Sequence, residues 1–246
     1  MTKNPPDLAG KTALVTGASR GLGRATALAL AEAGAHVLAL ARTVGGLEDL
    51  DDEIKAVGGT ASLVPLDLAD QTAIERLGPA LSARFHKLDI LVANAATLGE
   101  LGPLADIAES TWKTTLDVNL TANWRLIKTL DPLLRASGAA RVAFVTSSVG
   151  SEARAFWGAY AISKAALDML ARLYAIEAKI AGVRIAIIDP GAMRTAMRRQ
   201  AMPGENPETL PEPREIAPLL FQALSPDYDG LAERFVMSEW RAAEKS

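Results

Sequence analysis

Residues 12–23 read TALVTGASRGLG, and this stretch decides the fold of the chain. Its apolar first part, residues 12–16, predicts a short buried strand, and the residues beyond the glycines predict a helix over about 23–33. Glycine permits tight backbone turns, and the amides at a helix N-terminus attract anions such as a pyrophosphate. The glycines of this turn are Gly17, Gly21 and Gly23. A strand, a Gly-rich turn and a helix in this order predict a dinucleotide-binding site.

Short apolar runs alternate with helical patterns along the rest of the chain. The other expected strands are residues 36–41, 60–66, 88–93, 140–146, 183–189 and 233–237. The expected helices are about 46–57, 71–85, a long region 104–136, 160–181 and 214–224. This alternation predicts an α/β fold, a Rossmann-type doubly wound parallel sheet of about seven strands with helices on both faces. We expect a single domain over residues 1–246.

Composition narrows the function classes. The 246 residues are 49% hydrophobic, and a net charge of −3 gives no electrostatic case for nucleic acid or an anionic membrane. The absence of cysteine excludes disulfides and thiolate chemistry, and two histidines do not make a His-rich metal site. The N-terminus has no apolar signal core, and no apolar run reaches membrane-spanning length. We therefore expect no metal, no membrane partner and a cytoplasmic location.

The end of the second expected strand bears on which dinucleotide binds. An acidic residue there would bind the ribose 2′-hydroxyl of NAD, whereas an arginine accommodates the 2′-phosphate of NADP. This strand is followed by Arg42, with no acidic residue, and the Gly-rich turn contains Arg20. Either arginine alone could be an ordinary solvated surface residue. Together, with the acid missing, they favour NADP(H) over NAD.

A second cluster of residues has the chemistry of an acid. Tyr160 and Lys164 lie four residues apart in a helical pattern, so they share one face, and Ser147 precedes Tyr160 by 13 residues. A neighbouring ammonium favours the ionised form of a phenol and lowers its pKa, which is near 10 in free tyrosine. Such a phenol can exchange a proton with a carbonyl oxygen or an alcohol near neutral pH.

Two other function classes, a hydrolase and a non-catalytic dinucleotide-binding module, make different demands on the same residues. Residues 17–21 also match G-x-S-x-G, the nucleophile elbow of α/β hydrolases, with Ser19 as nucleophile. That class needs a late histidine, and neither His36 nor His86 lies at a suitable position. A non-catalytic dinucleotide sensor or structural module would be expected to lose Tyr160 or Lys164, and both are present.

Together these residues resemble the short-chain dehydrogenase/reductase family over nearly the whole chain. The family's TGxxxGxG motif stands at residues 16–23, and its catalytic Asn, Ser, Tyr and Lys match Asn119, Ser147, Tyr160 and Lys164. Ser148 is the alternative to Ser147, which fits the family spacing better. Where the family has NNAG, this chain has Ala93-Asn94-Ala95-Ala96, which lacks one amide side chain and one glycine. Residues 146–166 and 190–198 further resemble a bacterial subgroup of the YciK type.

The resemblance implies hydride transfer between NADP(H) and a carbonyl or alcohol. Tyr160 would protonate the oxygen, Ser147 would polarise it, and Lys164 would hold the nicotinamide ribose and lower the Tyr160 pKa. Asn119 would position a water that links Lys164 to solvent. The residues implied in cofactor binding are Gly17, Ser19, Arg20, Gly21, Leu22, Gly23, Arg42, Asp67, Leu68, Asn94, Ala95, Ala96, Tyr160, Lys164, Pro190, Gly191 and Thr195.

For the substrate and the assembly, the sequence allows alternatives. Residues 192–213 contain four prolines and follow a strand end, so they are either a solvated connection or a lid over the site. The apolar residues near this region either contact an apolar or amphipathic carbonyl substrate or serve as core; they are Phe156, Trp157, Met193, Met197 and Met202. The family resemblance also allows a 3-oxoacyl thioester as substrate. The resemblance implies a homodimer or homotetramer built on the two long helices. Their apolar residues could equally serve only the core.

Overall fold

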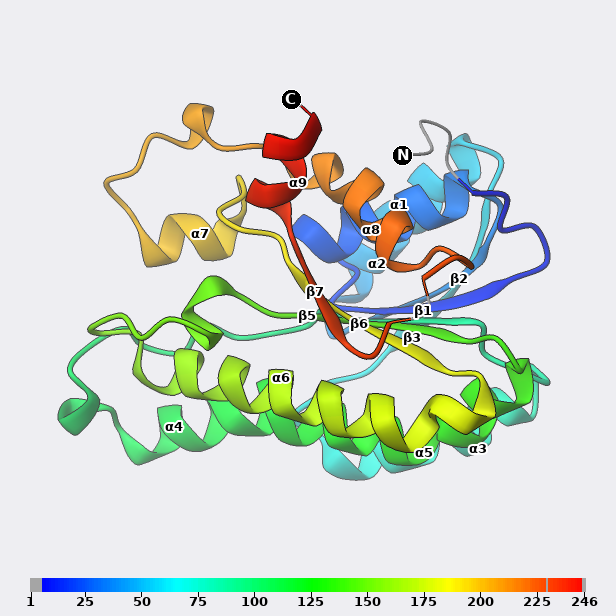
Figure 1. The fold of residues 1–246 in the computed structure, drawn as a ribbon, viewed down its shortest axis with the longest axis horizontal. Helices are drawn as coiled ribbons and strands as arrows, with labels where there is room; N and C mark the ends of the chain where they lie inside the picture. The colour runs from blue at the N-terminus through cyan, green and yellow to red at the C-terminus, as the bar shows by residue number, and fades with distance from the viewer. Residues whose placement is uncertain (1–5, 229, 245–246) are drawn as a thin grey trace.

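The computed structural model describes residues 6–228 and 230–244, and its centre is one parallel β-sheet (Figure 1). In the described residues the sheet has seven strands in the order β3-β2-β1-β4-β5-β6-β7. The strands are β1 (Thr12–Thr16), β2 (His36–Ala41), β3 (Thr60–Pro65), β4 (Ile90–Ala93), β5 (Arg141–Val145), β6 (Arg184–Asp189) and β7 (Glu233–Val236). The order reverses between β1 and β4, where α/β sheets of this kind bind ligands beyond the strand ends. The expected doubly wound architecture is confirmed.

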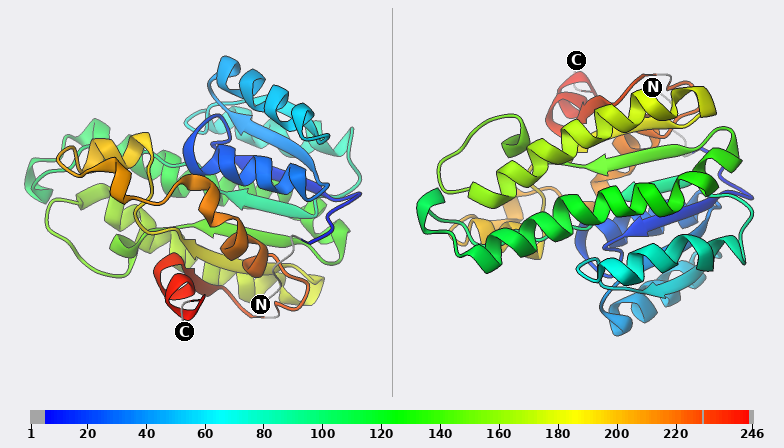
Figure 2. Two further views of the ribbon diagram at one scale, coloured as in Figure 1. Left: turned by 90° about the horizontal axis from the view of Figure 1, so that it is seen from above. Right: turned by 90° about the horizontal axis from the view of Figure 1, so that it is seen from below.

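Helices cover both faces of the sheet (Figures 1 and 2). One face carries α1 (Gly21–Glu32), α2 (Val44–Ala56) and α8 (Ala217–Ala223), and the other carries α3 (Gln71–Ser82), α5 (Ala122–Ser137) and α6 (Gly158–Ala178). Successive side chains of a strand point to opposite faces, so Ala13 and Val15 of β1 join the first core and Leu14 joins the second. The central strands are therefore apolar on both faces, as in the buried run ILVA of β4.

The expected long helix over residues 104–136 is wrong in detail. The structure has a 3₁₀ turn at Leu104–Asp106, then α4 (Glu109–Leu116), a π-helical turn at Asp117–Thr121, and α5. The π-turn contains Asn119, which is fully buried. Such turns insert one extra residue into a helix and are frequent at functional sites. No periodicity in the sequence marks this extra residue.

Two helices were not expected. Residues 192–213 are not wholly irregular, because they contain α7 (Ala196–Ala201) and 3₁₀ turns at Pro207–Thr209 and Pro213–Ile216. The side chain of Thr195 caps α7 by accepting a hydrogen bond from the Arg198 amide at 3.1 Å. A last helix, α9 (Met237–Glu244), follows β7. Within the described ranges, no helix is both long and apolar enough to cross a membrane.

Candidate active site

In the turn between β1 and α1, the positions of Gly17 and Gly23 leave little or no room for a side chain. Gly17 has a φ of +70°, and a Cβ placed on Gly23 would lie 2.2 Å from the Gly17 carbonyl oxygen. A Cβ on Gly17 itself would lie 3.0 Å from the Ala95 Cα. Helix α1 begins after Arg20, and the Arg20 side chain makes no capping hydrogen bond to the amides at the positive N-terminal end of the helix. This bare backbone cradle suits the pyrophosphate of a dinucleotide.

We expect Gly23→Ala to disrupt the cradle. Its new Cβ would overlap backbone rather than a flexible side chain, so the free energy of unfolding should fall by about 1–3 kcal/mol. Gly45→Ala in α2 is the matched control, because no atom lies within 4 Å of its added Cβ, and it should be neutral or slightly stabilising. Chemical denaturation of both variants is the measurement. Equal stability of the two variants would show that the Gly23 turn accommodates a side chain.

Asn94 supports this cradle from the neighbouring strand end. Its side-chain amide donates to the Thr16 carbonyl at 2.9 Å, and the backbone amides of Asn94 and Ala95 donate to the Thr16 hydroxyl at 3.0 Å. The ends of β1 and β4 are thereby tied together at the point where the strand order reverses. The structure thus gives the Asn94 side chain a supporting role in the cradle, and its expected contact with the cofactor stays a prediction.

The adenine end of the expected site holds an exposed ion pair. Arg42 and Asp67 approach to 3.8 Å, and their side chains are 69% and 45% exposed. The other Asp67 oxygen accepts the Ala69 amide at 2.9 Å, and Leu68 beside it is buried. Arg20 is exposed and has no ion pair within the described part of the chain. The end of β2 thus has an acid nearby after all, contributed by the end of β3, although Asp67 already pairs with Arg42.

Ser147 and Tyr160 meet beyond the C-terminal ends of the strands. Tyr160, in the first turn of α6, is only 8% exposed, and its phenol forms a hydrogen bond with the side chain of Ser147. Ser147 directly follows Thr146 after β5, whereas Ser148 lies in a 3₁₀ turn and its carbonyl accepts the Ser151 hydroxyl and amide. The structure therefore favours Ser147 over Ser148 as the partner of Tyr160.

The pKa of Tyr160 is raised rather than lowered in this structure, so the expectation of a lowered pKa is wrong for the cofactor-free protein. Burial raises the pKa of Tyr160 to about 12, the Ser147 hydrogen bond acts against this, and the charge of Asp189 adds to it. The Lys164 ammonium lies 5.8 Å from the Tyr160 ring centroid and donates to the Val145 carbonyl at 2.7 Å. The phenol therefore keeps its proton at neutral pH, which is the form a proton donor needs.

Lys164 is itself perturbed, because it is only 2% exposed. Burial lowers the pKa of Lys164 to about 8, while the charges of Asp168 and Asp189 raise it. Desolvation disfavours the ammonium, so these two carboxylates offset part of that penalty. Lys164 is still mostly protonated at neutral pH.

Asn119 is held at the centre of the π-helical turn. Its side-chain oxygen accepts the Thr97 amide at 2.8 Å, and its side-chain nitrogen donates to the Thr97 carbonyl at 2.9 Å and to the Ser163 hydroxyl at 3.0 Å. Ser163 in turn donates to the Tyr160 carbonyl at 2.7 Å. Asn119 therefore anchors the first turn of α6, which carries Tyr160, to the loop after β4.

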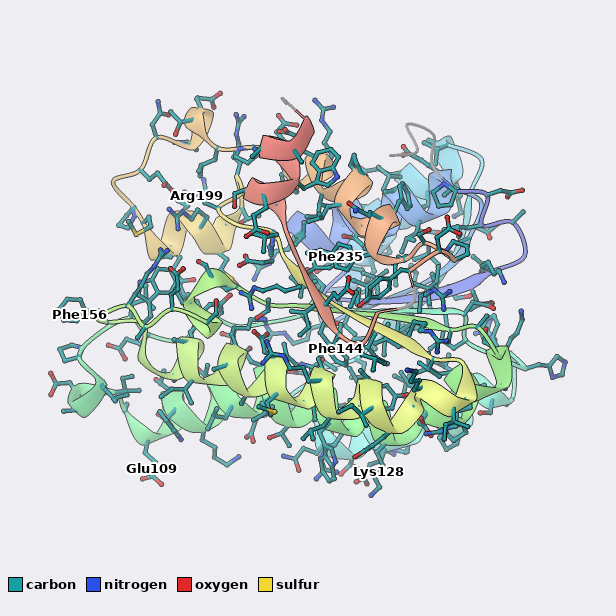
Figure 3. All side chains as sticks on the ribbon, in the orientation of Figure 1. Glu109, Lys128, Phe144, Phe156, Arg199 and Phe235 are labelled. Atoms are coloured by element: carbon teal, nitrogen blue, oxygen red, sulfur yellow. The ribbon has the colours of Figure 1, made fainter. Side chains whose placement is uncertain are left out.

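A small apolar cluster encloses the Tyr160 ring. Leu98 and Val149 are buried with it, and Trp157 and Met197 pack against them, with the Trp157 ring centroid 6.0 Å from that of Tyr160. Met197 comes from α7, so residues 192–213 do reach the site. Of the other apolar residues considered for this pocket, Met193 lies in the core and Met202 and Phe156 are exposed. Figure 3 shows Phe156 on the loop before α6, at the same end of the molecule as Arg199 of α7.

The hydrolase alternative does not fit the structure. His36 is the first residue of β2, and its ring nitrogens contact the hydroxyls of Thr60 at 2.8 Å and Ser62 at 3.0 Å. His86 is exposed shortly before β4 begins. Both lie at the N-terminal edge of a parallel sheet, whereas Ser19 lies beyond the C-terminal end of β1. Neither histidine of the chain can reach Ser19.

The remaining expected residues lie in the turn after β6. Gly191 has a φ of +66°, and its amide donates to the Asp189 carboxylate at 3.1 Å. Sequence reasoning missed Asp189, and it missed Asp168 and Arg234, which join it in a buried ion-pair cluster. The sequence signal for this cluster was the four-residue spacing of Lys164 and Asp168, which places both on one helix face. The position of Arg234 on β7 gave none.

The fold and this arrangement of Ser147, Tyr160 and Lys164 define a class of oxidoreductases. A sequence model of the short chain dehydrogenases matches residues 11–206, and the chain belongs to that family. It is 36% identical to the oxidoreductase YciK of Escherichia coli over 217 residues, which cover 87% of this chain and 86% of YciK.

Two further relatives differ in their named cofactor. The chain is 35% identical to an oxidoreductase of Mycobacterium tuberculosis named as NAD-dependent, over 80% of this chain and 76% of the relative. It also superposes on the crystal structure of a short chain dehydrogenase of Shigella flexneri complexed with NADP. That comparison has a TM-score of 0.90 and 32% identity, and it covers 95% of this chain and 99% of the other.

Proposed function

We propose that this protein is an NADP(H)-dependent reductase of carbonyl compounds, which also acts in reverse on secondary alcohols. The observation that carries the proposal is the buried Tyr160 phenol, hydrogen-bonded to Ser147 and one helical turn from Lys164. Its raised pKa keeps the phenol protonated at neutral pH, as the reduction of a carbonyl requires. The proton donor, the hydrogen-bonding group for the substrate oxygen and the nearby cation come from the same end of the sheet.

The residues present fit a bound dinucleotide. The side-chain-free cradle of Gly17, Gly21 and Gly23 would hold the pyrophosphate, and Leu68 and Asp67 would border the adenine. Arg42 and Arg20 supply positive charge for a 2′-phosphate, and the NADP complex of the Shigella relative supports this choice. The Mycobacterium relative is named as NAD-dependent, so the cofactor preference of this protein needs a direct test with an Arg42 variant.

Four side chains of the protein have separate roles in the proposed reaction. When bound, the reduced nicotinamide supplies a hydride to the carbonyl carbon. Ser147 orients the substrate oxygen, and the Tyr160 phenol gives that oxygen its proton. Lys164 contributes a positive charge that favours the phenolate left behind, and Asn119 fixes the helix turn that carries Tyr160.

We further propose that residues 192–213 form a lid over an apolar substrate site. Met197 of α7 packs in the cluster around Tyr160, together with Trp157. Phe156, beside it, has a φ of +71°, which is an unfavourable backbone conformation for a bulky residue. Strain of this kind is common where a residue contacts a ligand. A 3-oxoacyl thioester is one member of the apolar substrate class.

A homodimer or homotetramer is also proposed. Leu126, Leu130 and Leu167 of α5 and α6 are used by the core, but other apolar residues of these helices remain exposed. They include Trp124, Met169, Leu173 and Ile176. A second copy of the chain would cover this surface. For the protein as a whole, a cytoplasmic location and the absence of nucleic-acid and membrane partners remain proposals.

The proposal predicts NADPH oxidation that depends on a carbonyl substrate. A panel of apolar ketones, aldehydes and 3-oxoacyl thioesters should contain compounds that accelerate it, and NADH should serve less well. The alternative function, a non-catalytic dinucleotide sensor, predicts binding of NADPH without turnover of any panel member. Absorbance of the reduced nicotinamide and calorimetric binding distinguish the two.

A further inference from the structure

Three charged side chains meet beneath the site. They have no part in the proposed hydride and proton transfer. Arg234 of β7 reaches Asp168 of α6 at 2.5 Å and Asp189 at the end of β6 at 2.9 Å. The two carboxylates are 5% and 4% exposed. Charges removed from water interact strongly, so such a cluster is costly to build and costly to break.

The same guanidinium also holds the catalytic serine. It donates to the Ser147 carbonyl at 2.7 Å, while the Ser147 side chain bonds to Tyr160. The second oxygen of Asp189 accepts the Gly191 amide at 3.1 Å. Arg234 therefore joins the loop after β5, helix α6 and the turn after β6, all of which carry site residues.

The charges of this cluster balance. Lys164 and Arg234 are cations, and Asp168 and Asp189 are anions, so the buried group is neutral overall. One Asp168 oxygen is buried and accepts no hydrogen bond from any described residue, so its charge is poorly screened. Both carboxylates raise the pKa of Lys164 against the effect of burial.

Few other groups face Lys164. Besides Asp168, the titratable neighbour of Lys164 on helix α6 is Tyr160. Strand β5 presents the Val145 carbonyl to the Lys164 ammonium. The 3₁₀ turn after β5 packs on Lys164 through Gly150, and the uncharged Asn119 of the π-helical turn donates to Ser163, the residue before Lys164. Two nearby charges, Lys113 of α4 and Asp117 at the start of the π-helical turn, form an ion pair with each other.

We propose that Arg234, Asp168 and Asp189 form a positioning triad for the active site. Arg234 fixes the Ser147 carbonyl and the turn at Gly191, and the two carboxylates balance the charge of Lys164. The triad acts through Ser147 and Lys164 and needs no contact with the substrate. Its catalytic meaning rests on the proposed function, but its effect on Lys164 does not.

The first test is an NMR titration of the Lys164 side chain in the cofactor-free protein. Asp168→Asn removes a negative charge, which disfavours the ammonium, so the titration should move to lower pH. Arg234→Gln removes a positive charge and should move it to higher pH. Asp131→Asn is the control, since that carboxylate binds Tyr174 and Arg135 away from the site and should leave Lys164 unchanged.

If the triad had a purely structural role, Asp168→Asn and Arg234→Gln would lower stability without moving the Lys164 titration. That result would overturn the proposal. Because this readout needs no substrate, a shifted titration in a protein that reduces nothing would refute only the proposed function. Conversely, an unshifted titration in an active enzyme would refute only the triad.

The second test uses Arg234→Lys, which keeps the charge but cannot form the forked set of contacts. The Lys164 titration should stay near that of the native protein, whereas kcat should fall by about 10²-fold because Ser147 loses its anchor. Arg241→Gln, at a surface ion pair with Glu215, is the control and should keep native kcat. An unchanged kcat in Arg234→Lys would contradict the triad even if Asp168→Asn and Arg234→Gln failed to fold.

Discussion

Tyr160→Phe should lose about 10²–10⁴-fold in kcat while it folds and binds NADPH as the native protein does. The substitution removes one hydroxyl and keeps the ring, which packs with Leu98, Val149 and Trp157. The proton donor and the partner of Ser147 disappear, and the hydrophobic contacts remain. Steady-state rates, a fluorescence binding titration of NADPH and thermal unfolding measure the three properties separately.

Tyr174→Phe is the matched control for this experiment. Tyr174 lies on the same helix and is also buried, but its hydroxyl donates to Asp131 at 2.8 Å, away from Ser147. This variant should keep native kcat. If Tyr160→Phe kept native turnover as well, the acid would be another group and the role given to Tyr160 would be wrong.

Arg42→Asp should reverse the preference for NADPH. A hydrogen bond to a charged group contributes about 1.5–3 kcal/mol, so the preference should fall roughly 10- to 150-fold. The new carboxylate would lie near Asp67, which would lose its partner, and the two acids would together repel a 2′-phosphate. The ratio of kcat/KM for NADPH and NADH is the measurement.

Arg84→Asp controls for the change in net charge. Arg84 stacks over the Phe85 ring before β4, at the opposite edge of the sheet from Arg42. Its substitution should leave the cofactor ratio unchanged. The same unchanged ratio in Arg42→Asp would mean that Arg42 is a solvated surface residue and that NADP preference has another origin.

Much of the fold was predictable because the strands are apolar on both faces. Strands β1 and β2 have the expected bounds, since each apolar run ends at a glycine, an arginine or another clear break. Helix α9 and the short α7 were missed, because each is shorter than three full turns and has too few residues to establish a period. The π-helical turn at Asn119 depends on contacts with Thr97 and Ser163, which lie far away in the sequence.

The sequence predicted which side chains of the candidate site lie together, but not the electrostatics of these side chains. The spacing of Ser147, Tyr160 and Lys164 brought together side chains that the structure also brings together. The sequence alone suggested that Lys164 lowers the Tyr160 pKa, because helical spacing shows proximity but not burial. Burial dominates instead, and the balancing charges come from Asp189 and Arg234 on strands that only the folded sheet makes neighbours.

Transfer of deuterium from NADPH that carries deuterium at both C4 positions tests the central claim most directly. The native protein, supplied with an active carbonyl compound from the panel, should place one deuterium on the carbinol carbon for each cofactor oxidised. Mass spectrometry of the alcohol product would show it, and Tyr160→Phe should slow that transfer severely. Oxidation of the cofactor with no deuterium in the product, or product formed equally fast by Tyr160→Phe, would contradict the account.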